Sequence, residues 1–438
     1  MNIAILYERK TREIYNDLLL KIELESRGHN CIISQMYEGD KFIGGTEKPD
    51  VILAPHLYST REIPRIWSRF GECDKIINLQ YEQILSYEQI KESIFDPKGE
   101  AKKAYHICWG KNTHDRLLNA GINKNKLPIL GAIQLDLLRD EYRLESYKQK
   151  EKYALRFRLD KNKKWLLFLS SFTYADAADA WVKMNENNVN ASRENTRSLH
   201  SMSRKEILGW FSSLLDVNDE IEIIYRPHPD ENFLASVNEI ENQYENFHII
   251  REDPVKNWIN CCDYIYSWYS TSVVEAYYMK KNFSILRPIR IKSESEINFL
   301  KEMDFIETKE EFLENAIKYN STGTSKTNIH LIESYYYVDL NQTAIVKYAN
   351  FIESIYSNNE SCEFKISSKE LIKAKYKTFG VKIMYNLFKV FRERIKLSEY
   401  RKRTNNNYFI RWFIEMDNQI CGNNELSLLE MELKERFK

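Results

Sequence analysis

The chain has 438 residues and a mass of 52.3 kDa, so we expect two domains with an appendage rather than one small module. Hydrophobic residues make up 43%, and there are only 13 Gly and 9 Pro, which predicts a globular protein with a large core and excludes long low-complexity stretches. Lys plus Arg and Asp plus Glu number 64 each, so the charge of the whole chain gives no argument for a polyanionic partner.

The seven cysteines and the first residues bear on the compartment. Only Cys261 and Cys262 are adjacent, and no pair has the C-x-x-C spacing of a zinc or redox site, so we expect free thiols in a reducing compartment. The opening residues, MNIAILYERK, lack the apolar h-region of a signal peptide, and no apolar run approaches the roughly 18 residues of a membrane-spanning helix. We therefore expect a cytoplasmic location.

The first third of the chain alternates short apolar runs with helical patterns. Strands are expected at 3–6 and 31–34, with an amphipathic helix at 13–26 between them, which makes a βαβ unit. Further strands are expected at 51–54, 75–79, 106–109 and 127–130. Alternating strands and helices are typical of a doubly wound parallel sheet, so residues 1–145 are predicted to form a Rossmann-like α/β domain.

A charged bridge at 137–164 precedes a second series of strands. These strands are expected at 165–169, 221–225, 247–250, 264–266 and 283–286, with helices at 204–215 and 272–279 among them. Residues 146–330 are therefore predicted to form a second Rossmann-like α/β domain, followed by a helical extension at 331–438. Ligands of open parallel sheets bind at the carboxyl ends of the strands, so two facing domains of this kind predict one cleft.

The helical extension carries a basic segment. Residues 365–403 hold 13 Lys or Arg and 3 acids, a local charge of +10. The apolar residues Met384, Leu387, Phe388, Phe391 and Ile395 recur at helical spacing, which predicts a basic amphipathic helix. Two interpretations stay open, a packing helix with a solvated face and a helix that docks on an anionic membrane surface. Nucleic acid is not favoured, because no recognition motif accompanies the charge.

The segment 221–231, I-E-I-I-Y-R-P-H-P-D-E, places an Arg and a His directly after an expected strand. Two prolines bracket His228 and restrict the loop, so Arg226 and His228 are expected at the carboxyl end of the sheet. Arg is a permanently charged forked donor, and His can donate to a phosphate oxygen or to a leaving group. The pair is typical of a phosphate site, with a surface loop and an unrelated His as the alternative.

A hydroxyl-rich turn follows the strand expected at 264–266. Ser270, Thr271 and Ser272 precede a helix, and the N–H groups and hydroxyls at such a helix start favour an anion. Alternatively, Glu275 completes an S/T-x-x-E capping box with Ser272, and the segment only starts the helix. Because this turn and the loop at 226–228 follow strands of one domain, together they predict a nucleotide or a sugar phosphate as ligand.

Other polar residues near expected strand ends fall into two kinds. Ser170, Ser171 and Thr173 directly follow the first strand of the second domain and are placed to line the same cleft, with an ordinary polar loop as the alternative. His29 and Asp136 are predicted to be structural, because the first ends a helix and the second begins one.

Three polar side chains follow expected strands of the first domain, and we place them on the acceptor side. They are Glu8, His56 and Glu82. A transferase needs a base that deprotonates the acceptor hydroxyl, for which Glu82 is the first candidate and Glu8 the second. Either carboxylate could instead pair with an Arg such as Arg12.

The motifs of metal and cofactor sites are missing from the sequence. There is no D-x-D between a strand and a helix, no H-E-x-x-H, and no cluster of His or Cys. There is also no G-x-x-x-x-G-K-[ST] loop and no G-x-G-x-x-G after the first strand, so NTPase and dehydrogenase functions are not favoured. We expect metal-independent catalysis without a cofactor, in which Arg226, His228 and helix dipoles meet the phosphate charge.

The motifs of both domains resemble known families. R-P-H-P-D-E at 226–231 and D-Y-I-Y-S-W-Y-S-T-S-V-V-E-A at 263–276 are similar to the His-Pro and Ser-rich motifs of GT-B transferases with cytidine-nucleotide donors, namely bacterial sialyltransferases, capsule Kdo transferases and CDP-glycerol glycerophosphotransferases. The first domain resembles the bacterial surface carbohydrate biosynthesis family in I-L-Y-E-R-K-T-R-E at 5–13, R-G-H at 27–29, C-W-G at 108–110 and L-G-A-I-Q-L-D at 130–136. That family shows G-N-P-R-F-D at the last place, so the chain departs from it at 132–135.

The resemblance covers about residues 1–330 and implies a GT-B-like fold whose second domain holds the donor and whose first domain holds the acceptor. Matched motif to motif, it implies that Arg226 and His228 contact the donor phosphates and that Glu275 contacts the ribose hydroxyls. It assigns Ser270, Thr271 and Ser272 to the phosphate at the helix start. A carboxylate one turn into that helix can accept from a diol, and the departing phosphate gains charge as the glycosidic bond breaks.

We therefore expect a GT-B glycosyltransferase that moves a sugar from a CMP- or CDP-linked donor to a bacterial surface polysaccharide, such as capsule or lipopolysaccharide, or to a lipid-linked glycan. Its expected partners are the nucleotide-sugar, the acceptor and an anionic membrane surface at 365–403, with a location at the inner face of the cell membrane. The alternatives are a polyol phosphotransferase using CDP-glycerol or CDP-ribitol, a nucleotide-sugar epimerase, and a non-catalytic membrane scaffold.

Overall fold

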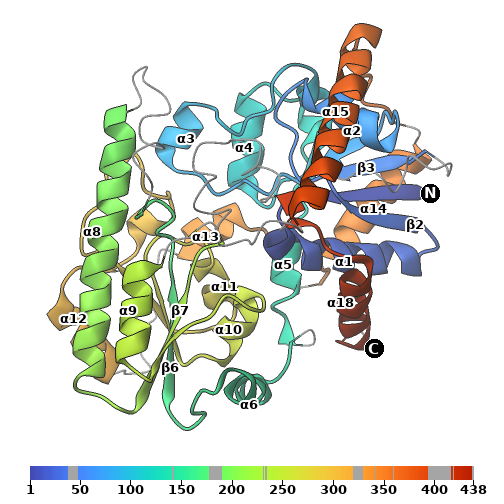
Figure 1. Cartoon of the computed structure of the whole chain (residues 1–438). Coiled ribbons are helices and arrows are strands. Elements are labelled where there is room, and N and C mark those ends of the chain that lie inside the picture. The colour runs from blue at the N-terminus through green and yellow to red at the C-terminus, as the bar shows by residue number, and fades with distance from the viewer. Residues whose placement is uncertain are drawn as a thin grey trace. The chain divides into compact units, whose positions relative to one another are not determined.

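The computed structural model describes most of the chain, which folds into two compact units (Figure 1). The described residues are 1–37, 48–140, 143–176, 190–229, 231, 234–318, 329–339, 341–358, 360–392, 416–417 and 419–436. Unit 1 comprises Met1–Gln83, Gln89–Leu137 and Glu333–Lys438, and unit 2 comprises Ile84–Glu88 and Leu138–Ile332. Residues from the end of the chain therefore belong to the same unit as the N-terminus.

Unit 1 is built on a parallel sheet with the order β2-β1-β3-β4-β5. Its described strands are β1 (Asn2–Tyr7), β2 (Asn30–Gln35), β3 (Val51–Ala54), β4 (Ile76–Asn78) and β5 (Tyr105–His106). The run expected as a strand at 127–130 forms only one bridge, between Cys108 and Ile129. Pairing stops there because Pro128 has no N–H to donate and the backbone of Gly131 is left-handed, with φ of 85°.

The helices of unit 1 come from both ends of the chain. The described ones are α1 (Lys10–Ser26), α2 (Glu62–Phe70), α4 (Lys111–Asn119), α5 (Ile133–Asp136), α14 (Ala344–Ser357), α15 (Ser368–Arg392) and α18 (Asn423–Arg436), with 3₁₀ turns at Gly99–Lys103 and Lys124–Lys126. Two further helices, α3 (Tyr87–Lys91) and α13 (Ile329–Tyr335), lie where the chain changes unit. Ion pairs join α1 to the two C-terminal helices, with Lys21 Nζ 2.9 Å from Glu430 and Arg27 Nη1 2.9 Å from Glu353.

The W-G motif accommodates the returning chain. The backbone oxygen of Trp109 accepts a hydrogen bond from the N–H of Tyr337 at 2.7 Å, and its ring stacks on Tyr336 with the centroids 5.5 Å apart. A Cβ on Gly110 would lie 2.5 Å from the carbonyl carbon and oxygen of Tyr335. Glycine is needed at this position because the backbone of another segment lies against it.

The G-x-x-x-x-D motif holds the start of α14 in the same way. The Asp136 carboxylate accepts from the N–H of Ile345 at 2.8 Å, and the Tyr348 hydroxyl donates to the Gly131 carbonyl at 3.0 Å. His29 also contacts α14, with Nε2 2.9 Å from Glu353. His29 follows the end of α1 as expected, whereas the prediction that Asp136 begins a helix is wrong, because Asp136 is the last residue of α5 and its carboxylate binds the start of α14.

Unit 2 is built on a second parallel sheet, with the order β11-β10-β9-β6-β7-β8. Its described strands are β6 (Lys164–Leu169), β7 (Ile221–Arg226), β8 (Phe247–Ile249), β9 (Tyr264–Ser267), β10 (Phe283–Leu286) and β11 (Phe305–Ile306). The helices around it are α6 (Ser146–Phe157), α8 (Asn190–Leu215), α9 (Ala235–Gln243), α10 (Val255–Cys261), α11 (Val273–Tyr278) and α12 (Lys309–Lys318), with a 3₁₀ turn at Leu300–Glu302. The sequence patterns did not indicate β11, which has two residues.

In both sheets the order of the strands reverses at one point, and this point indicates where a ligand is expected. In unit 1 the chain moves from β1 out to β2 and then returns to β3 on the other side of β1. In unit 2 it moves from β6 to β7 and β8 and then returns to β9 on the other side of β6. The carboxyl ends of β1 and β3, and those of β6 and β9, therefore flank a topological switch point, where open α/β sheets bind ligands.

The basic helix α15 does not have the single apolar face expected from the sequence. Phe388 is buried together with Tyr385 against Met416, whereas Leu387 and Met384 are exposed. The side chain of Phe391 and all of Ile395 lie outside the described residues. The apolar residues at 384–388 thus divide between an inner and an outer face, because α15 packs against its own unit on the side opposite Leu387. Within the described part of the chain, no helix is long and apolar enough to cross a membrane.

Candidate functional site

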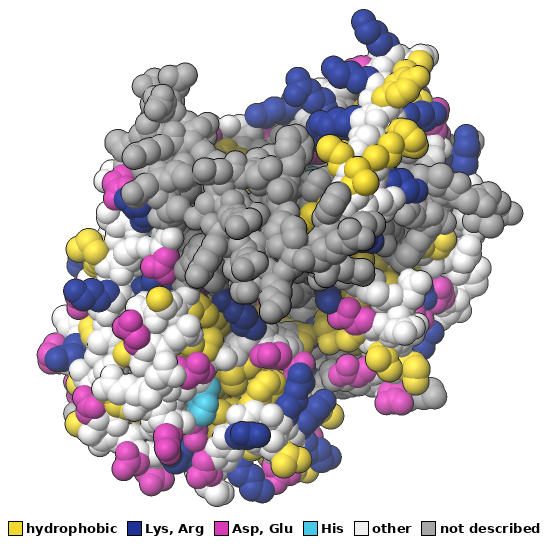
Figure 2. All heavy atoms as spheres, in the orientation of Figure 1, with side chains coloured by type: hydrophobic (Ala, Val, Ile, Leu, Met, Phe, Trp, Pro, Cys, Tyr) yellow, Lys and Arg dark blue, Asp and Glu magenta, His cyan; other side chains and the backbone are white. Residues whose placement is uncertain are grey.

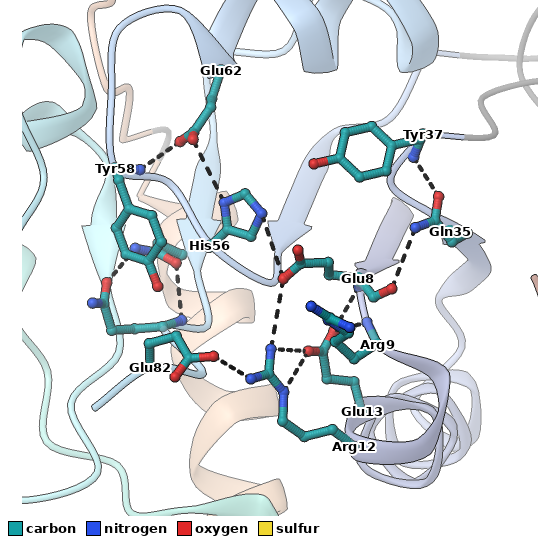
Figure 3. Close-up of polar contacts among 12 residues, drawn as sticks. Glu8, Arg9, Arg12, Glu13, Gln35, Tyr37, His56, Tyr58, Glu62 and Glu82 are labelled. Carbon is teal, nitrogen blue, oxygen red and sulfur yellow. Dashed lines mark hydrogen bonds and ion pairs between the residues drawn. The ribbon is translucent and has the colours of Figure 1, made fainter. Parts of the chain in front are cut away.

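A cluster of charged side chains lies at the switch point of the unit 1 sheet (Figure 3). Glu8 follows β1, His56 follows β3 and Glu82 follows β4. Arg12, in the first turns of α1, lies among them. The structure therefore brings together the three acceptor-side residues that the sequence put forward and the Arg12 named there as their pairing partner.

Arg12 is the centre of the ion pairs in this cluster. Its Nε and Nη2 lie 2.8 and 2.5 Å from Glu13 Oε1, its Nη1 pairs with Glu82, and its Nη2 is 3.7 Å from Glu8 Oε2. Burial lowers the pKa of Arg12, but the carboxylates of Glu13 and Glu82 outweigh it and the net shift is upward. A permanent positive charge is thus fixed between three carboxylates, two of which, Glu8 and Glu82, are partly exposed.

Glu13 is fully buried and closes the start of α1. Its Oε2 accepts hydrogen bonds from the backbone N–H groups of Glu8 and Arg9, at 2.6 and 3.2 Å. Burial raises the pKa of this carboxyl, and the positive charge of Arg12 opposes that shift. The N–H groups at this helix start are therefore already satisfied by the protein.

His56 lies between two carboxylates. Its Nδ1 is 3.7 Å from Glu62 Oε1 and its Nε2 is 3.8 Å from Glu8 Oε2, while its ring stacks on Tyr58. Glu62 is itself anchored, because its Oε2 accepts from the N–H groups of Tyr58 and Ser59 at 2.5 and 3.2 Å. Burial lowers the pKa of His56, but Glu62 and Glu8 outweigh it and raise the pKa. The imidazole therefore lies between two carboxylates, at distances longer than a direct hydrogen bond.

Beneath this cluster is a second buried carboxyl, Asp17. The Tyr81 hydroxyl donates to Asp17 Oδ1 at 3.0 Å, and Oδ2 has no hydrogen-bond partner in the described structure. Burial, and then the charge of Glu13, raise the pKa of Asp17 well above its usual range. Burial thus favours the neutral form of Asp17 relative to an exposed aspartate.

In unit 2 the loop after β7 is tied to neighbouring backbone. The Arg226 guanidinium donates to the carbonyl of Glu252 at 2.8 Å and to that of Asp253. Burial lowers the pKa of Arg226 to about 10. The backbone N–H of His228 lies 3.4 Å from Glu231 Oε2. These two hydrogen bonds use part of the guanidinium, so only the remaining N–H groups of Arg226 can donate to a ligand.

Ser170, at the end of β6, belongs to a buried network rather than to an open surface. Its hydroxyl lies 2.8 Å from that of Tyr225 and 2.5 Å from Glu231 Oε2, and Tyr225 also donates to Glu231 Oε1 at 2.7 Å. Burial raises the pKa of Glu231, and these donors oppose the shift. This network fixes the loop at 226–231 to the sheet. Ser171 is buried and Thr173 is half-buried beside it.

The turn after β9 contains the hydroxyls and backbone N–H groups that we expect to bind an anion in unit 2. The Ser270 hydroxyl accepts from the N–H of Ser272 at 3.2 Å, and α11 begins at Val273. The capping box between Ser272 and Glu275 is not formed, because no side-chain hydrogen bond caps α11. Thr271 is exposed, and Ser270 and Ser272 are half-buried. The hydroxyls of this turn are thus not engaged in capping the helix.

Glu275 is the least satisfied carboxylate of this region. Its Oε2 is buried and has no hydrogen-bond partner in the described structure. Burial raises the pKa of Glu275 to about 7, and the charges of Lys256 and Arg226 oppose that shift. A buried carboxyl oxygen without a partner favours a ligand that donates a hydrogen bond to it.

Sequence reasoning missed several members of these clusters. Glu62 could have been found, since it begins a helix shortly after His56 and the strand β3. Glu13 and Asp17 are four residues apart on the buried face of α1, and two carboxylates at that spacing on an apolar face are a detectable signal.

The described residues contain no group of three or more His, Cys, Asp or Glu that could hold a metal ion.

The chain matches no protein-family model and no curated protein, but solved structures match it. The wall teichoic acid polymerase TagF, in a variant soaked with CDPG, has a TM-score of 0.52 at 11% identity, over 82% of this chain and 90% of its own. Staphylococcus aureus MnaA with UDP has a TM-score of 0.51 at 14% identity, over 82% and 97%. The UDP-GlcNAc 2-epimerase of Methanocaldococcus jannaschii with UDP-GlcNAc and UDP has a TM-score of 0.50 at 15% identity, over 81% and 100%. At these identities the likeness shows the fold, which is GT-B-like with two Rossmann-like domains.

Proposed function

We propose that this chain is a glycosyltransferase that moves a sugar from a nucleotide-activated donor to a bacterial surface polysaccharide or a lipid-linked glycan. The observation that carries the proposal is the charged cluster at the switch point of unit 1, where Glu8, His56 and Arg12 meet. A cluster of this kind, partly exposed at the carboxyl edge of a parallel sheet, supports acid–base chemistry on a bound substrate.

The donor is assigned to unit 2. The backbone N–H groups and hydroxyls of Ser270, Thr271 and Ser272 are proposed to hold a phosphate, with charge compensation from Arg226 and a hydrogen bond from His228. Ser171 and Thr173 line the same edge after β6. Glu275, whose Oε2 has no partner, is proposed to accept from the ribose hydroxyls. As the bond to the sugar breaks, these fixed donors stabilise the charge that develops on the departing phosphate.

Cytidine is proposed as the nucleotide on the basis of the motifs at 226–231 and 263–276. A GT-B structure soaked with CDPG and others containing UDP are both similar to this chain, so the fold accommodates either pyrimidine nucleotide. The catalytic contacts proposed here go to phosphate and ribose, which these nucleotides share. The identity of the base is therefore the first property to test.

For the acceptor, Glu8 is proposed as the general base. Of the two carboxylates put forward from the sequence, Glu82 forms a direct ion pair with Arg12, so its carboxylate is already engaged by a guanidinium. Glu8 Oε2 lies farther from Arg12, at 3.7 Å, and faces His56 Nε2 at 3.8 Å. In the proposed step the acceptor hydroxyl gives its proton to Glu8 while its oxygen attacks the anomeric carbon, and the nucleotide departs with the bonding electrons.

His56 and Arg12 are proposed to position this base. Glu62 Oε1 lies 3.7 Å from His56 Nδ1, and the raised pKa of His56 favours the imidazolium, whose charge is proposed to orient Glu8. Glu8→Gln is expected to lower kcat by about 100-fold or more with little change in KM for the donor. Equal losses in donor affinity and kcat would instead indicate a binding role for Glu8.

Two second candidates are favoured by the structural comparisons. Likeness to TagF favours transfer of a polyol phosphate from a CDP-alcohol, which forms a phosphodiester and releases CMP. Likeness to UDP-GlcNAc 2-epimerases favours epimerisation of a nucleotide-sugar without an acceptor. Phosphorus in the product would support the first candidate, and turnover of the donor alone would support the second.

The experiment that tests the proposal measures thermal stabilisation by CMP, CDP, UDP, GDP and ADP. A ligand at 100 times its Kd should add about 2.7 kcal/mol to the unfolding free energy. We expect stabilisation by CMP or CDP that is lost in His228→Ala and reduced in Glu275→Gln. Glu239→Gln, an exposed carboxylate on α9, is the matched control and should respond like the unchanged protein.

The outcomes separate the hypotheses. A preference for UDP or GDP would keep the enzyme and refute the cytidine assignment. Loss of the response in Glu239→Gln as well would refute the assignment of the nucleotide to the α11 region. No response to any nucleotide would refute the transferase and favour a non-catalytic scaffold.

A further inference from the structure

The helix α15 carries an apolar stripe on its outer face. Five large side chains on this helix, all between 45% and 74% exposed, make up the stripe: Ile372, Tyr376, Phe379, Ile383 and Leu387. Their spacing of three or four residues places them within an arc of about 80° on a helix with 3.6 residues per turn. Scattered apolar residues are normal on a protein surface, but a continuous row of five along one helix is not.

This stripe is not the face that attaches α15 to the protein. The opposite side is buried at Ala374, Tyr385 and Phe388, and the Thr378 hydroxyl lies 2.7 Å from that of Ser68 on α2. A packing helix requires one apolar face, and α15 has two. The outer stripe therefore requires an explanation other than the fold of unit 1.

Lysines border the stripe on both sides. On the same helical geometry, Lys373 and Lys377 follow one edge, and Lys375, Lys382 and Lys389 follow the other. Four of these five lysines are exposed and Lys382 is half-exposed, and the only acid in α15 is Glu370. Figure 2 shows yellow side chains along this helix with dark blue side chains beside them.

We propose that the outer stripe of α15 docks the protein on an anionic lipid bilayer, with the helix lying in the plane of the interface. In this arrangement the stripe enters the boundary between headgroups and acyl chains, and the two rows of lysines meet anionic headgroups. Tyr376 and Phe379 lie near the middle of the helix. Aromatic side chains such as these are favoured at the boundary between headgroups and acyl chains.

The charge pattern selects the bilayer over other occupants. Two copies of this chain pairing through the stripe would bring lysine rows together, which opposes association. Nucleic acid would be held by the lysines but offers nothing to the apolar row between them. An anionic bilayer is complementary to both components at once. This inference rests on α15 alone and does not depend on the proposed function.

The test is flotation of the full chain with vesicles of phosphatidylcholine alone and of phosphatidylcholine with one quarter phosphatidylglycerol. We expect binding to the anionic vesicles, weakening as salt rises from 0.1 to 0.5 M because lysine contacts are screened. The double variant Tyr376→Ser/Phe379→Ser should lower the partition coefficient at least tenfold. The charge variant Lys373→Glu/Lys377→Glu should lower the partition coefficient by about 25-fold or more relative to the unchanged protein, since each lysine contributes about fivefold.

Matched controls are available on α6 of unit 2. Leu155 is 87% exposed and Lys152 is exposed, so Leu155→Ser and Lys152→Glu remove the same groups elsewhere. Both should leave the partition coefficient unchanged. Because every substituted side chain is on the surface, the melting temperature should stay constant in all variants.

Three results would overturn the inference. The unchanged protein could fail to bind anionic vesicles. The α15 variants could bind as tightly as the α6 variants. Finally, sedimentation could reveal a dimer that Tyr376→Ser/Phe379→Ser converts to monomer, which would make a second copy the occupant of the stripe.

Discussion

Substitution of Gly110 tests whether the W-G motif exists to admit the returning chain. A Cβ at this position would lie 2.5 Å from the carbonyl carbon and oxygen of Tyr335 and 2.7 Å from the oxygen of Ser334. All of these are backbone atoms, so no side-chain rotation relieves the overlap. The φ of Gly110 is −155°, which any residue adopts, so the whole effect of Gly110→Ala is steric.

The expected magnitude follows from this geometry. Overpacking of a well-filled interior destabilises by about 1–3 kcal/mol, and contact with rigid backbone favours the upper end. Gly209→Ala in α8 is the matched control, because a Cβ there meets nothing within 4 Å and alanine is favoured over glycine in a helix by about 1 kcal/mol. Gly110→Ala should therefore lower the unfolding free energy by about 3 kcal/mol. Gly209→Ala should raise it by about 1 kcal/mol, so the two variants differ by about 4 kcal/mol.

Urea unfolding monitored by fluorescence measures this difference. We expect Gly110→Ala to lower the midpoint without a change in slope, and Gly209→Ala to raise it slightly. For domains of 150–250 residues, 3 kcal/mol corresponds to about 6–12 °C in melting temperature. A Gly110→Ala protein as stable as the unchanged chain would show that the segment at 333–337 does not lie against this glycine.

Three further predictions concern buried groups. Glu275→Gln should abolish any pH dependence of nucleotide affinity centred near pH 7, where burial places the pKa of this carboxyl; the ratio of the two proteins' Kd values between pH 6 and 8 isolates its titration from that of the ligand. The pKa of Asp17 is raised on folding, so this carboxyl stabilises the fold fully only below about pH 4. That stabilisation is lost as pH rises toward the pKa of the folded state, by up to about 1.4 kcal/mol per pH unit. Asp17→Asn should remove this pH dependence of the unfolding free energy, measured by urea unfolding at pH 5, 6 and 7. Phe388→Ala should destabilise by about 3 kcal/mol, whereas Leu387→Ala, on the exposed face of α15, should change the unfolding free energy by less than about 0.5 kcal/mol.

The sequence predicts the sheets of this protein better than its sites, for a physical reason. The strands are apolar runs buried on both faces, and such runs can be recognised from the residue types alone. The roles of Arg226 and Ser170 depend on partners far away in the chain, the carbonyls of Glu252 and Asp253 for one and Glu231 for the other. Periodicity cannot show which of a polar side chain's hydrogen bonds the fold already uses.

The same distinction applies to the motifs of unit 1. Those around Trp109, Gly131 and Asp136 are conspicuous in the sequence, and in the structure they bind α14 and the segment that leads into it. Glu8, His56 and Glu82, in contrast, follow three strands and were found because the carboxyl edge of a parallel sheet is predictable. The pairing of Glu82 with Arg12 is one of the alternatives that the sequence leaves open, whereas the contact of His56 with Glu62 required the structure.

The return of the chain to unit 1 has a consequence for the order in which the protein is made. The Tyr7 hydroxyl accepts from the N–H of Cys421, and Cys362 donates its N–H to the Asp74 carbonyl, so unit 1 is completed by residues translated after unit 2. Unit 2 is almost continuous in the chain and can fold while translation proceeds, but the N-terminal sheet must wait for α14 and α18. During that interval the side of α1 that later contacts α14 and α18 is uncovered on the nascent chain. Chaperone occupancy during synthesis is therefore expected to depend on residues 333–438, which follow unit 2, rather than on the first strands.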